Sequence, residues 1–414
     1  MYQIFIFTYL CGVAVASLFS KKVRNMWLGE RQSIKIVNQK VVPGAKYIWV
    51  HAASLGEFEQ GRPLMEYIRR EHPEYKILLT FFSPSGYEVR KDYDGADIVC
   101  YLPIDTPRNA RRFLRAIRPE MAFFIKYEFW YNYLHIMKHR GIPTYSVSSI
   151  FRDNQIFFRW YGRGYGKVLR CFTKFYVQNE KSRELLHSIG IKDVDISGDT
   201  RFDRVLDIKS VAKQLPIVEK FKCGHKTFIA GSSWLPDEEV FIPFFKDYSD
   251  WRLIIAPHVI KEEHLMQIEE LLYRNGRTAI RYSKLNSESD LCLLADNNTS
   301  VLIIDCFGLL SSIYNYGDVT YVGGGFGAGI HNLLEAAVWN KPVFFGPNNA
   351  RFQEAQDLKD CGGGLEIKNA ADFSDLMQKM ISDDEYLLEA ADAAGNYVND
   401  HAGAIAKIMS SINL

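Results

Sequence analysis

Short apolar runs alternate along the chain with longer segments whose apolar residues recur every three to four positions. Such an alternation of strands and helices is typical of a parallel sheet covered by helices on both faces. We therefore expect an α/β domain in the first half of the chain. The pattern predicts strands at 47–52, 76–82, 98–102, 121–125, 144–148 and 174–178, and helices at 59–70, 108–117 and 131–139.

The pattern pauses in the polar stretch 205–225 and then begins again. We predict a second α/β domain, with a cleft between the two domains and ligands at the carboxyl ends of the strands. The predicted domains are 25–208 and 209–390, followed by a C-terminal helix at 391–414 that can pack back. The second domain has predicted strands at 227–231, 252–256, 301–305, 319–323 and 342–346, and a polar loop at 284–299.

Residues 1–20 carry no charged side chain, and this apolar run ends at Lys21, Lys22 and Arg24. About 20 apolar residues are enough to cross a bilayer as a helix. Because the cations follow the run, the positive-inside rule places the rest of the chain in the cytoplasm. We predict a membrane anchor over residues 1–24, spanning or half-inserted. A buried helix and a cleaved signal peptide are the alternatives, although a signal peptide normally has its cations before the apolar stretch.

Composition narrows the class of protein. Apolar residues make up 47% of the 414 residues and charged residues 24%, which excludes a disordered chain, a collagen-like repeat and a multi-span membrane protein. The formal charge of +1 gives no global field for nucleic acid. None of the seven cysteines forms a CxxC pair, so neither a zinc site nor a disulfide framework is indicated. The two DxD patterns, at 92–94 and 193–195, are short and common, and we predict no metal and no cofactor.

The segment His51–Glu57 follows the first predicted strand. Gly56 permits a tight turn, and Glu57 falls in the first helical turn, where the helix dipole favours an ionised carboxylate. Such a carboxylate can act as a general base toward a hydroxyl group. Ser54 and Glu57 also have the spacing of a capping box, in which both side chains only satisfy backbone donors. The spacing leaves both interpretations open.

A second carboxylate, Glu128, follows the strand predicted at 121–125. Two carboxylates at neighbouring strand ends can share a substrate that carries a hydroxyl group. Glu128 can equally be a first-turn helix charge or a partner of Lys126. Trp130 is more typical of a core residue than of a stacking surface.

A glycine-rich loop at 323–329 follows a predicted strand and precedes a predicted helix. Backbone N–H groups of such a loop and the helix N-terminus can bind a phosphate, although the spacing is not that of the dinucleotide fingerprint. Two serines and a histidine end other strands of this domain, where each can also be structural. The candidate donor-binding residues are Ser232, Ser233, Pro257, His258, Gly323, Gly324, Gly325, Gly327, Asn332 and Glu335.

Basic and aromatic residues are interleaved between Phe151 and Lys167. Such a segment can bind nucleic acid or an anionic membrane surface, or it can be a solvated basic face. Beside an apolar N-terminal run, we favour the membrane.

Together these segments resemble the Kdo transferases, the 3-deoxy-D-manno-octulosonic acid transferases of lipopolysaccharide synthesis. The matching pieces occur in the same order and cover nearly the whole chain. They are the apolar N-terminus, WVHAASLGE at 49–57, Glu128-Phe-Trp130 with Asn132, Gln178-Asn179-Glu180, Gly198-Asp-Thr-Arg-Phe-Asp203, His331-Asn332, the Leu334–Ala337 segment and Gly346-Pro347.

The resemblance implies a GT-B glycosyltransferase fold of two Rossmann-like domains. It implies CMP-Kdo as donor, a lipid A precursor (lipid IVA) as acceptor, and no nucleic acid as partner. It also implies inverting, metal-independent transfer at the cytoplasmic face of the cell inner membrane. Glu57 matches the family's catalytic base and Glu128 its second essential glutamate, while Gly325, Asn332 and Glu335 match its nucleotide-binding segment. The acceptor is then expected to contact Ser54, Gly56, Lys126, Arg152, Arg159 and Arg163.

The chain departs from this family at Ala256-Pro257-His258, where an arginine often separates the proline and the histidine. Arg201 or Arg351 can supply the missing cation. Two other functions stay open at this level. One is a GT-B-like sugar-nucleotide epimerase, and the other is a non-catalytic, membrane-tethered nucleotide-binding scaffold, for which Glu57→Ala would leave function intact.

Overall fold

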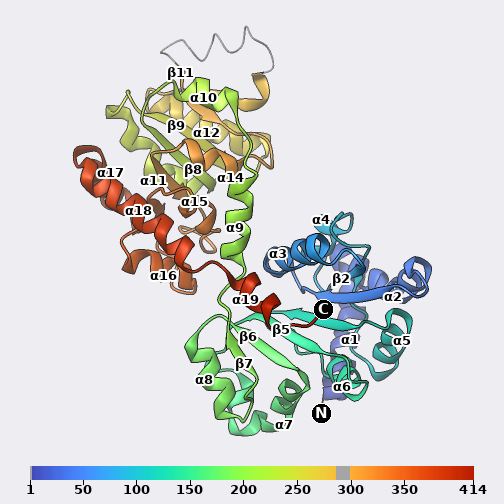
Figure 1. Cartoon of the computed structure of the whole chain (residues 1–414). Helices are drawn as coiled ribbons and strands as arrows, with labels where there is room; N and C mark the ends of the chain where they lie inside the picture. The colour runs from blue at the N-terminus through green and yellow to red at the C-terminus, as the bar shows by residue number, and fades with distance from the viewer. Residues whose placement is uncertain (1, 286–298) are drawn as a thin grey trace. The chain divides into compact units, whose positions relative to one another are not determined.

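A computed structural model describes residues 2–285 and 299–414 and divides the chain into two compact units (Figure 1). The first unit comprises Met1–Arg204 and Ala402–Leu414, and the second comprises Val205–His401. Residues 286–298, which form most of the predicted polar loop and include Cys292, lie outside the described residues.

The first unit is built on a parallel sheet. Its strands are β1 Lys46–His51, β2 Tyr75–Phe81, β3 Ile98–Tyr101, β4 Met121–Ile125, β5 Thr144–Ser149, β6 Lys174–Val177 and β7 Val194–Ile196. Their order in the sheet is β3-β2-β1-β4-β5-β6-β7. The direction of progression therefore reverses between β1 and β4, which pair with His51 opposite Phe124. In doubly wound sheets, ligands bind at the carboxyl ends of the strands on either side of such a reversal.

Helices cover both faces of this sheet. They are α1 Tyr2–Phe19, α2 Lys21–Lys40, α3 Leu55–Glu71, α4 Pro84–Arg90, α5 Pro107–Ile117, α6 Tyr131–His139, α7 Arg163–Gly166, α8 Glu180–Ser188 and α19 Ala404–Ser410. On one face, α2, α5, α6 and α8 pack on residues such as Trp49 and Phe124. On the other, α3 and α19 pack on residues such as Val50 and Phe123. Both faces of the strands are thus buried, as their continuous apolar runs predict.

The second unit has a parallel sheet of strand order β10-β11-β9-β8-β12-β13-β14. Its strands are β8 Thr227–Ser233, β9 Arg252–Pro257, β10 Thr278–Arg281, β11 Thr299–Ile303, β12 Val319–Val322, β13 Val343–Phe345 and β14 Gly364–Glu366. The order reverses between β8 and β12. The helices of this unit are α10 Pro216–Lys222, α11 Leu235–Phe241, α12 Glu262–Arg274, α14 Leu310–Ile313, α15 Leu334–Ala337, α16 Gln353–Asp360, α17 Ala370–Ser382 and α18 Asp384–Asp400, and α9 Arg201–Ser210 crosses from the first unit into the second.

The predicted strands are present with ends shifted by one or two residues, and β4 has the predicted bounds. The strands β7, β10 and β14 were not predicted. They have three or four residues each and lie at or beside the sheet edges, where strands carry few buried apolar positions. The polar pause at 205–225 contains most of α9 and all of α10.

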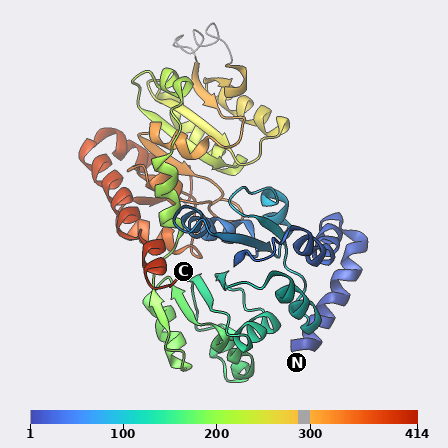
Figure 2. The ribbon, with the colours of Figure 1, turned by 45° about the vertical axis from the view of Figure 1, so that its right-hand side comes forward.

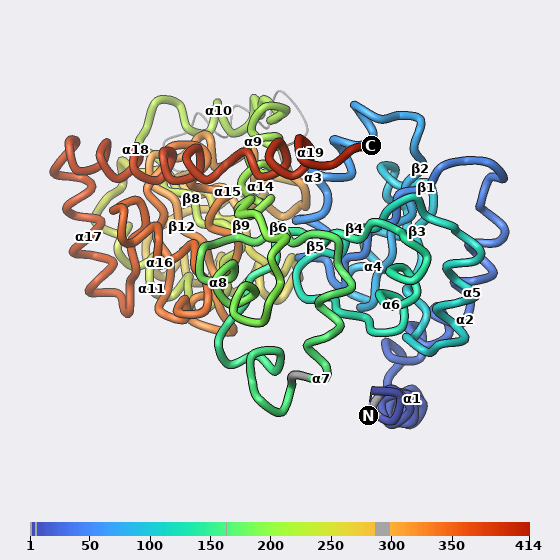
Figure 3. The backbone as a smooth tube through the Cα atoms, turned by 60° about the horizontal axis from the view of Figure 1, so that its bottom comes forward, coloured from blue at the N-terminus to red at the C-terminus, as the bar shows by residue number. Residues whose placement is uncertain are grey.

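Among the described residues, α1 is the helix that is long and apolar enough to cross a membrane, with a mean hydropathy of 1.8. Figure 2 shows α1, α2 and α5 side by side at one edge of the first unit. Figure 3 shows α1 end-on, on the same side as α7, and the rings of Tyr2 and Tyr165 lie 5.9 Å apart. Only 18% of the apolar window of α1 is buried, so α1 is not the buried helix that the sequence left open. Its exposed apolar side chains are Ile4, Phe7, Val15, Leu18 and Phe19.

Candidate active site

Glu57 and Glu128 lie at the reversal in the first sheet. Glu57 is in the first turn of α3, directly after β1, and Glu128 is in the loop between β4 and α6. Because β1 and β4 are paired, their carboxyl ends are neighbours. The proximity is also electrostatic, since the charge of Glu128 contributes to the pKa of Glu57. The predicted pairing of two carboxylates at neighbouring strand ends is therefore present.

The capping interpretation of Ser54 and Glu57 also holds. Ser54 is the N-cap of α3, and its hydroxyl accepts the backbone N–H of Glu57 at 3.4 Å. The carboxylate of Glu57 accepts the backbone N–H of Ala53 through Oε2 at 2.5 Å. That bond holds the carboxylate of Glu57 against the backbone, and the residue as a whole is half-buried.

Burial, and after it the negative charge of Glu128, raises the pKa of Glu57 to about 8. The backbone N–H groups of Ala53 and Ser54 and the ammonium of Lys126 act in the opposite direction but do not outweigh these effects. The expectation that the helix dipole keeps Glu57 ionised is therefore wrong, since desolvation outweighs the dipole. A carboxylate with a pKa near the working pH is well matched to general-base catalysis.

A buried network orients Glu128. Its Oε2 accepts the indole N–H of Trp130 at 2.7 Å and lies 3.2 Å from Nε2 of His51. Nδ1 of His51 lies 2.8 Å from the hydroxyl of Thr80, which also accepts the indole N–H of Trp49 at 2.8 Å. His51 and Thr80 are fully buried. The carboxylate of Glu128 is thus held by the partly buried Trp130 and by the fully buried His51.

Sequence reasoning did not identify His51 or Thr80 as functional, and it favoured a core role for Trp130. The available signal was the strand period: Trp49 and His51 alternate onto one face of β1, and Thr80 lies opposite His51 on β2. A polar pair on two neighbouring strands that are otherwise mostly apolar marks a buried polar network. Its link to Glu128 depends on the loop after β4, which the pattern does not predict.

Asp199 joins two of the motifs that carry the family resemblance, at 178–180 and 198–203, to Gln60 of α3. Its carboxylate accepts hydrogen bonds from Gln60 at 2.9 Å and Gln178 at 3.1 Å, and it forms an ion pair with Arg201 at 2.9 Å. Burial alone would raise the pKa of Asp199, but Arg201 and the hydrogen bond from Gln60 lower it. The charge of Lys126 acts on both Asp199 and Glu57, so Lys126 lies near both carboxylates.

The other predicted acceptor residues are less closely tied to Glu57. Gly56 is exposed at the start of α3, and Arg152 is exposed and interacts with the hydroxyl of Tyr127. Arg159 is exposed in the segment between β5 and β6, beside the exposed Trp160 and Tyr161. The side chain of Arg163 lies outside the described part of the structure.

The predicted donor residues gather at the reversal in the second sheet. Ser232 and Ser233 end β8, Pro257 ends β9 and His258 follows it, and the glycine loop follows β12. Ser232 is half-exposed with a φ of 52°. The hydroxyl of Ser233 instead points inward and donates to Glu238 at 2.7 Å, so it is not the phosphate donor that was expected.

The glycine loop uses much of its own hydrogen-bonding capacity. The N–H of Gly323 donates to the carbonyl of Gly231, that of Gly324 to Asp237, and that of Gly327 to the carbonyl of Gly324. A Cβ at Gly325 would lie 2.5 Å from the Cα of Gly346, so close packing of two loops explains that glycine. The expected cradle of loop N–H groups is thus partly wrong, and α15 after the loop has only four residues.

An aromatic stack lies beside this loop. The ring of His258 stacks on Trp234 with centroids 4.9 Å apart, and on His331 at 4.2 Å. Burial, and then the neighbouring His258, lowers the pKa of His331 to about 4, so its imidazole is neutral at pH 7. Asn332 donates from Nδ2 to Glu335 at 3.1 Å. Neutral stacked rings beside a strand reversal can receive a flat heterocycle.

Of the two candidate cations for the donor phosphate, Arg351 lies by the loop. It is exposed and donates to the carbonyl of Ala328 at 3.2 Å. Arg201 is in the first unit and is already paired with Asp199. The described residues contain no group of three or more His, Cys, Asp or Glu side chains that could hold a metal ion.

Comparison with known proteins finds relatives of this chain. A model of the 3-deoxy-D-manno-octulosonic-acid transferase (kdotransferase) family matches residues 27–204. The 3-deoxy-D-manno-octulosonic acid transferase of Aquifex aeolicus is 28% identical, over 81% of this chain and 86% of its own. That of Haemophilus influenzae is 24% identical, over 97% of this chain and 93% of its own. The chain is thus similar to Kdo transferases over most of its length. The predicted resemblance is confirmed, and these relatives support a glycosyltransferase.

The fold of this chain is shared by enzymes of other activities. The solved UDP-GlcNAc 2-epimerase of Neisseria meningitidis, bound to UDP-GlcNAc, has a TM-score of 0.59, over 87% of this chain and all of its own. At 14% identity, that likeness shows the fold alone. The predicted fold class, two Rossmann-like α/β domains of GT-B type with an apolar N-terminal helix, is confirmed.

Proposed function

We propose that this Kdo transferase is an inverting enzyme that moves Kdo from CMP-Kdo to the primary hydroxyl of a lipid A precursor, lipid IVA, with Glu57 as general base. The observation that carries the proposal is the position of Glu57. It stands at the β1–β4 reversal, beside Glu128, with its pKa raised to about 8.

The proposed reaction requires a general base. A sugar hydroxyl is too weakly acidic to attack unaided, and Glu57 would accept its proton as the oxygen approaches the anomeric carbon from the face opposite the departing CMP. General-base catalysis of this kind contributes roughly 10²–10⁴-fold. Glu128, held by Trp130 and His51, would orient the acceptor hydroxyl and keep Glu57 basic.

The second unit contains a stack of aromatic rings and a cation that suit the donor CMP-Kdo. The rings of Trp234, His258 and His331 suit a cytosine base, and Arg351 and the half-exposed Ser232 suit the single phosphate of CMP. One phosphate carries less charge than the diphosphate of most sugar nucleotides, so fixed donors and one cation can stabilise its departure without a metal.

For the acceptor, the first unit links α1 to the carboxylates. The ring of Tyr9 lies 6.2 Å from Phe82, and Phe82 lies 4.9 Å from Trp130, which donates to Glu128. A lipid that leaves the bilayer along α1 would therefore reach the proposed base over a short aromatic path. We accordingly propose that α1 holds the enzyme at the cytoplasmic face of the inner membrane, with Arg152 and Arg159 toward the acceptor phosphates.

The test is transfer by the full-length protein in detergent, supplied with CMP-Kdo and lipid IVA. We expect a lipid product heavier by Kdo, with inverted anomeric configuration by NMR and unchanged yield in EDTA. Glu57→Gln should lower kcat about 10²–10⁴-fold with little change in KM. Glu71→Gln, the same change at the exposed far end of α3, is the matched control.

Each failure has its own meaning. Absence of any Kdo transfer, or epimerisation of a sugar nucleotide in its place, would refute the transferase proposal. Undiminished turnover by Glu57→Gln would refute the assigned base. Retention of the donor's configuration would refute inversion.

A further inference from the structure

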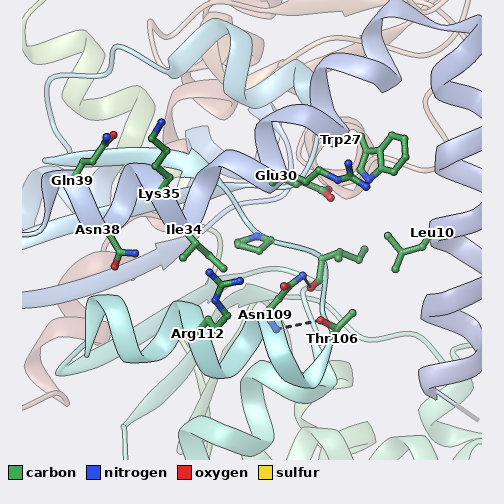
Figure 4. A pocket seen from close by; sticks show the side chains of 13 residues that line it. Leu10, Trp27, Glu30, Ile34, Lys35, Asn38, Gln39, Thr106, Asn109 and Arg112 are labelled. Carbon is green, nitrogen blue, oxygen red and sulfur yellow. Dashed lines mark hydrogen bonds between the residues drawn. The ribbon is translucent and has the colours of Figure 1, made fainter.

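A pocket lies in the first unit, between α1, α2 and the start of α5 (Figure 4). Its volume is about 590 Å³, within the range of sites that hold small molecules. One part of its wall is apolar and includes Leu10 of α1 and Ile34 of α2. The pocket is separate from Glu57 and Glu128, which do not line it.

Glu30 lines this pocket and is unusual for its burial. Only 5% of Glu30 is exposed, and its Oε1 has no hydrogen-bond partner within residues 2–285 and 299–414. Burial raises the pKa of Glu30 to about 8, so the carboxyl is largely protonated at pH 7. An unpartnered buried carboxyl is costly unless a ligand pairs with it, and a protonated one can donate a hydrogen bond to an acceptor oxygen.

Three cations surround the same pocket. Arg31 and Lys35 come from successive turns of α2, and Arg112 comes from α5 on the opposite wall (Figure 4). The guanidinium of Arg31 lies 4.1 Å from the centre of the Trp27 ring, which also lines the pocket. Glu30 is the one acidic residue among the lining side chains that the structure describes. The pocket is thus cationic, with an apolar wall and one buried hydrogen-bond donor.

We infer that this pocket binds the phosphate headgroup of an anionic glycerophospholipid. Arg31, Lys35 and Arg112 would pair with the phosphate, and Glu30 would donate to a phosphate or ester oxygen. Leu10 belongs to α1, whose outer face carries exposed apolar side chains, so the acyl chains would continue along that helix. The inference rests on the proposed membrane location of α1.

A bound lipid would join α1 to α2 and α5 through its headgroup. Where anionic lipid is present, the helix that is proposed to enter the membrane would then gain a further link to the catalytic unit. The same chemistry occurs in free phosphate and in the phosphates of lipid IVA, and the experiment has to separate these sources.

The test is calorimetric titration of the full-length protein in a non-ionic detergent with dihexanoyl phosphatidylglycerol. We expect saturable binding that Arg112→Glu weakens about tenfold or more, a loss of at least about 1.4 kcal/mol. Arg111→Glu, the same change on the neighbouring exposed residue outside the pocket, should bind as the wild type does. Glu30→Gln keeps a donor and should retain binding, whereas the equally neutral Glu30→Met should weaken it.

Several outcomes would overturn the inference. One is the absence of saturable binding, and another is an equal loss of affinity for the phosphatidylglycerol in Arg111→Glu and Arg112→Glu. The inference would also fail if inorganic phosphate competed fully with the phosphatidylglycerol, or if lipid IVA displaced it and occupied the pocket to the same extent. The titration needs neither CMP-Kdo nor turnover. Binding without transfer would therefore refute only the proposed function, and transfer without binding would refute only the lipid site.

Discussion

The hydroxyl of Tyr2 donates a hydrogen bond of 2.6 Å to Oδ2 of Asp105. Asp105 also accepts the backbone N–H groups of Asn132 at 2.9 Å and Tyr133 at 3.2 Å, at the start of α6. The loop that carries Glu128 ends where α6 begins. One buried carboxylate therefore connects the first turn of the apolar helix to the segment that positions a proposed catalytic glutamate.

Tyr2→Phe should loosen this connection. Losing a hydrogen bond to a buried carboxylate costs about 1–3 kcal/mol. We expect faster amide hydrogen exchange over residues 2–10 and a kcat/KM for lipid IVA that is several-fold lower. Tyr9→Phe is the control, because the ring of Tyr9 makes its contact with Phe82. Unchanged exchange in Tyr2→Phe would show that the other contacts of α1, which include the hydrogen bond from Gln3 to Asn132, hold the helix without this bond.

The pH dependence of transfer should report the ionisation of Glu57. The ionised form is the base, and burial and Glu128 raise the pKa of Glu57 to about 8, so kcat should rise with pH and level off above about 8. Glu128→Gln removes the negative neighbour and should move this ascending limb to lower pH, while the plateau falls. Glu71→Gln should superimpose on the wild type. A limb that stays in place or moves to higher pH in Glu128→Gln would contradict the coupling of the two carboxylates.

Thr80→Val tests the network behind Glu128. The substitution preserves shape but leaves the indole N–H of Trp49 and Nδ1 of His51 without their shared partner in a fully buried place. We expect a loss of about 1–3 kcal/mol in the free energy of unfolding and a lower kcat. Thr80→Ser keeps the hydroxyl and should recover most of both. Equal behaviour of the two variants in urea unfolding would mean that the hydroxyl is not the stabilising group.

The glycines of the loop should differ in whether they tolerate a substitution by alanine. A Cβ at Gly325 meets the backbone of Gly346 at 2.5 Å, whereas one at Gly327 meets only the carbonyl of Gly324 at 3.7 Å. Gly325→Ala should therefore destabilise the second unit by about 1–3 kcal/mol, as overpacking does, and Gly327→Ala should be close to neutral. Thermal unfolding measures both. A tolerated Gly325→Ala would show that the facing loop moves at low cost.

The features that the sequence alone determined are those encoded within a few neighbouring residues. The apolar run of Met121–Ile125 predicts a strand with the observed bounds, and the spacing of Ser54 and Glu57 predicts the start of α3. Local spacing is enough here because strand burial and helix capping depend on short segments. The family resemblance also needed only the order of local motifs.

The tertiary structure decided which distant residues meet and what state they are in. The pairing of β1 with β4 brings Glu128 to Glu57, and the desolvation that follows reverses the expected effect of the helix dipole on the pKa of Glu57. Asp237, which no motif included, takes the N–H of Gly324 and so changes the role of the glycine loop. The environment of a charge or a donor is set by segments remote along the chain, and local pattern carries no information about them.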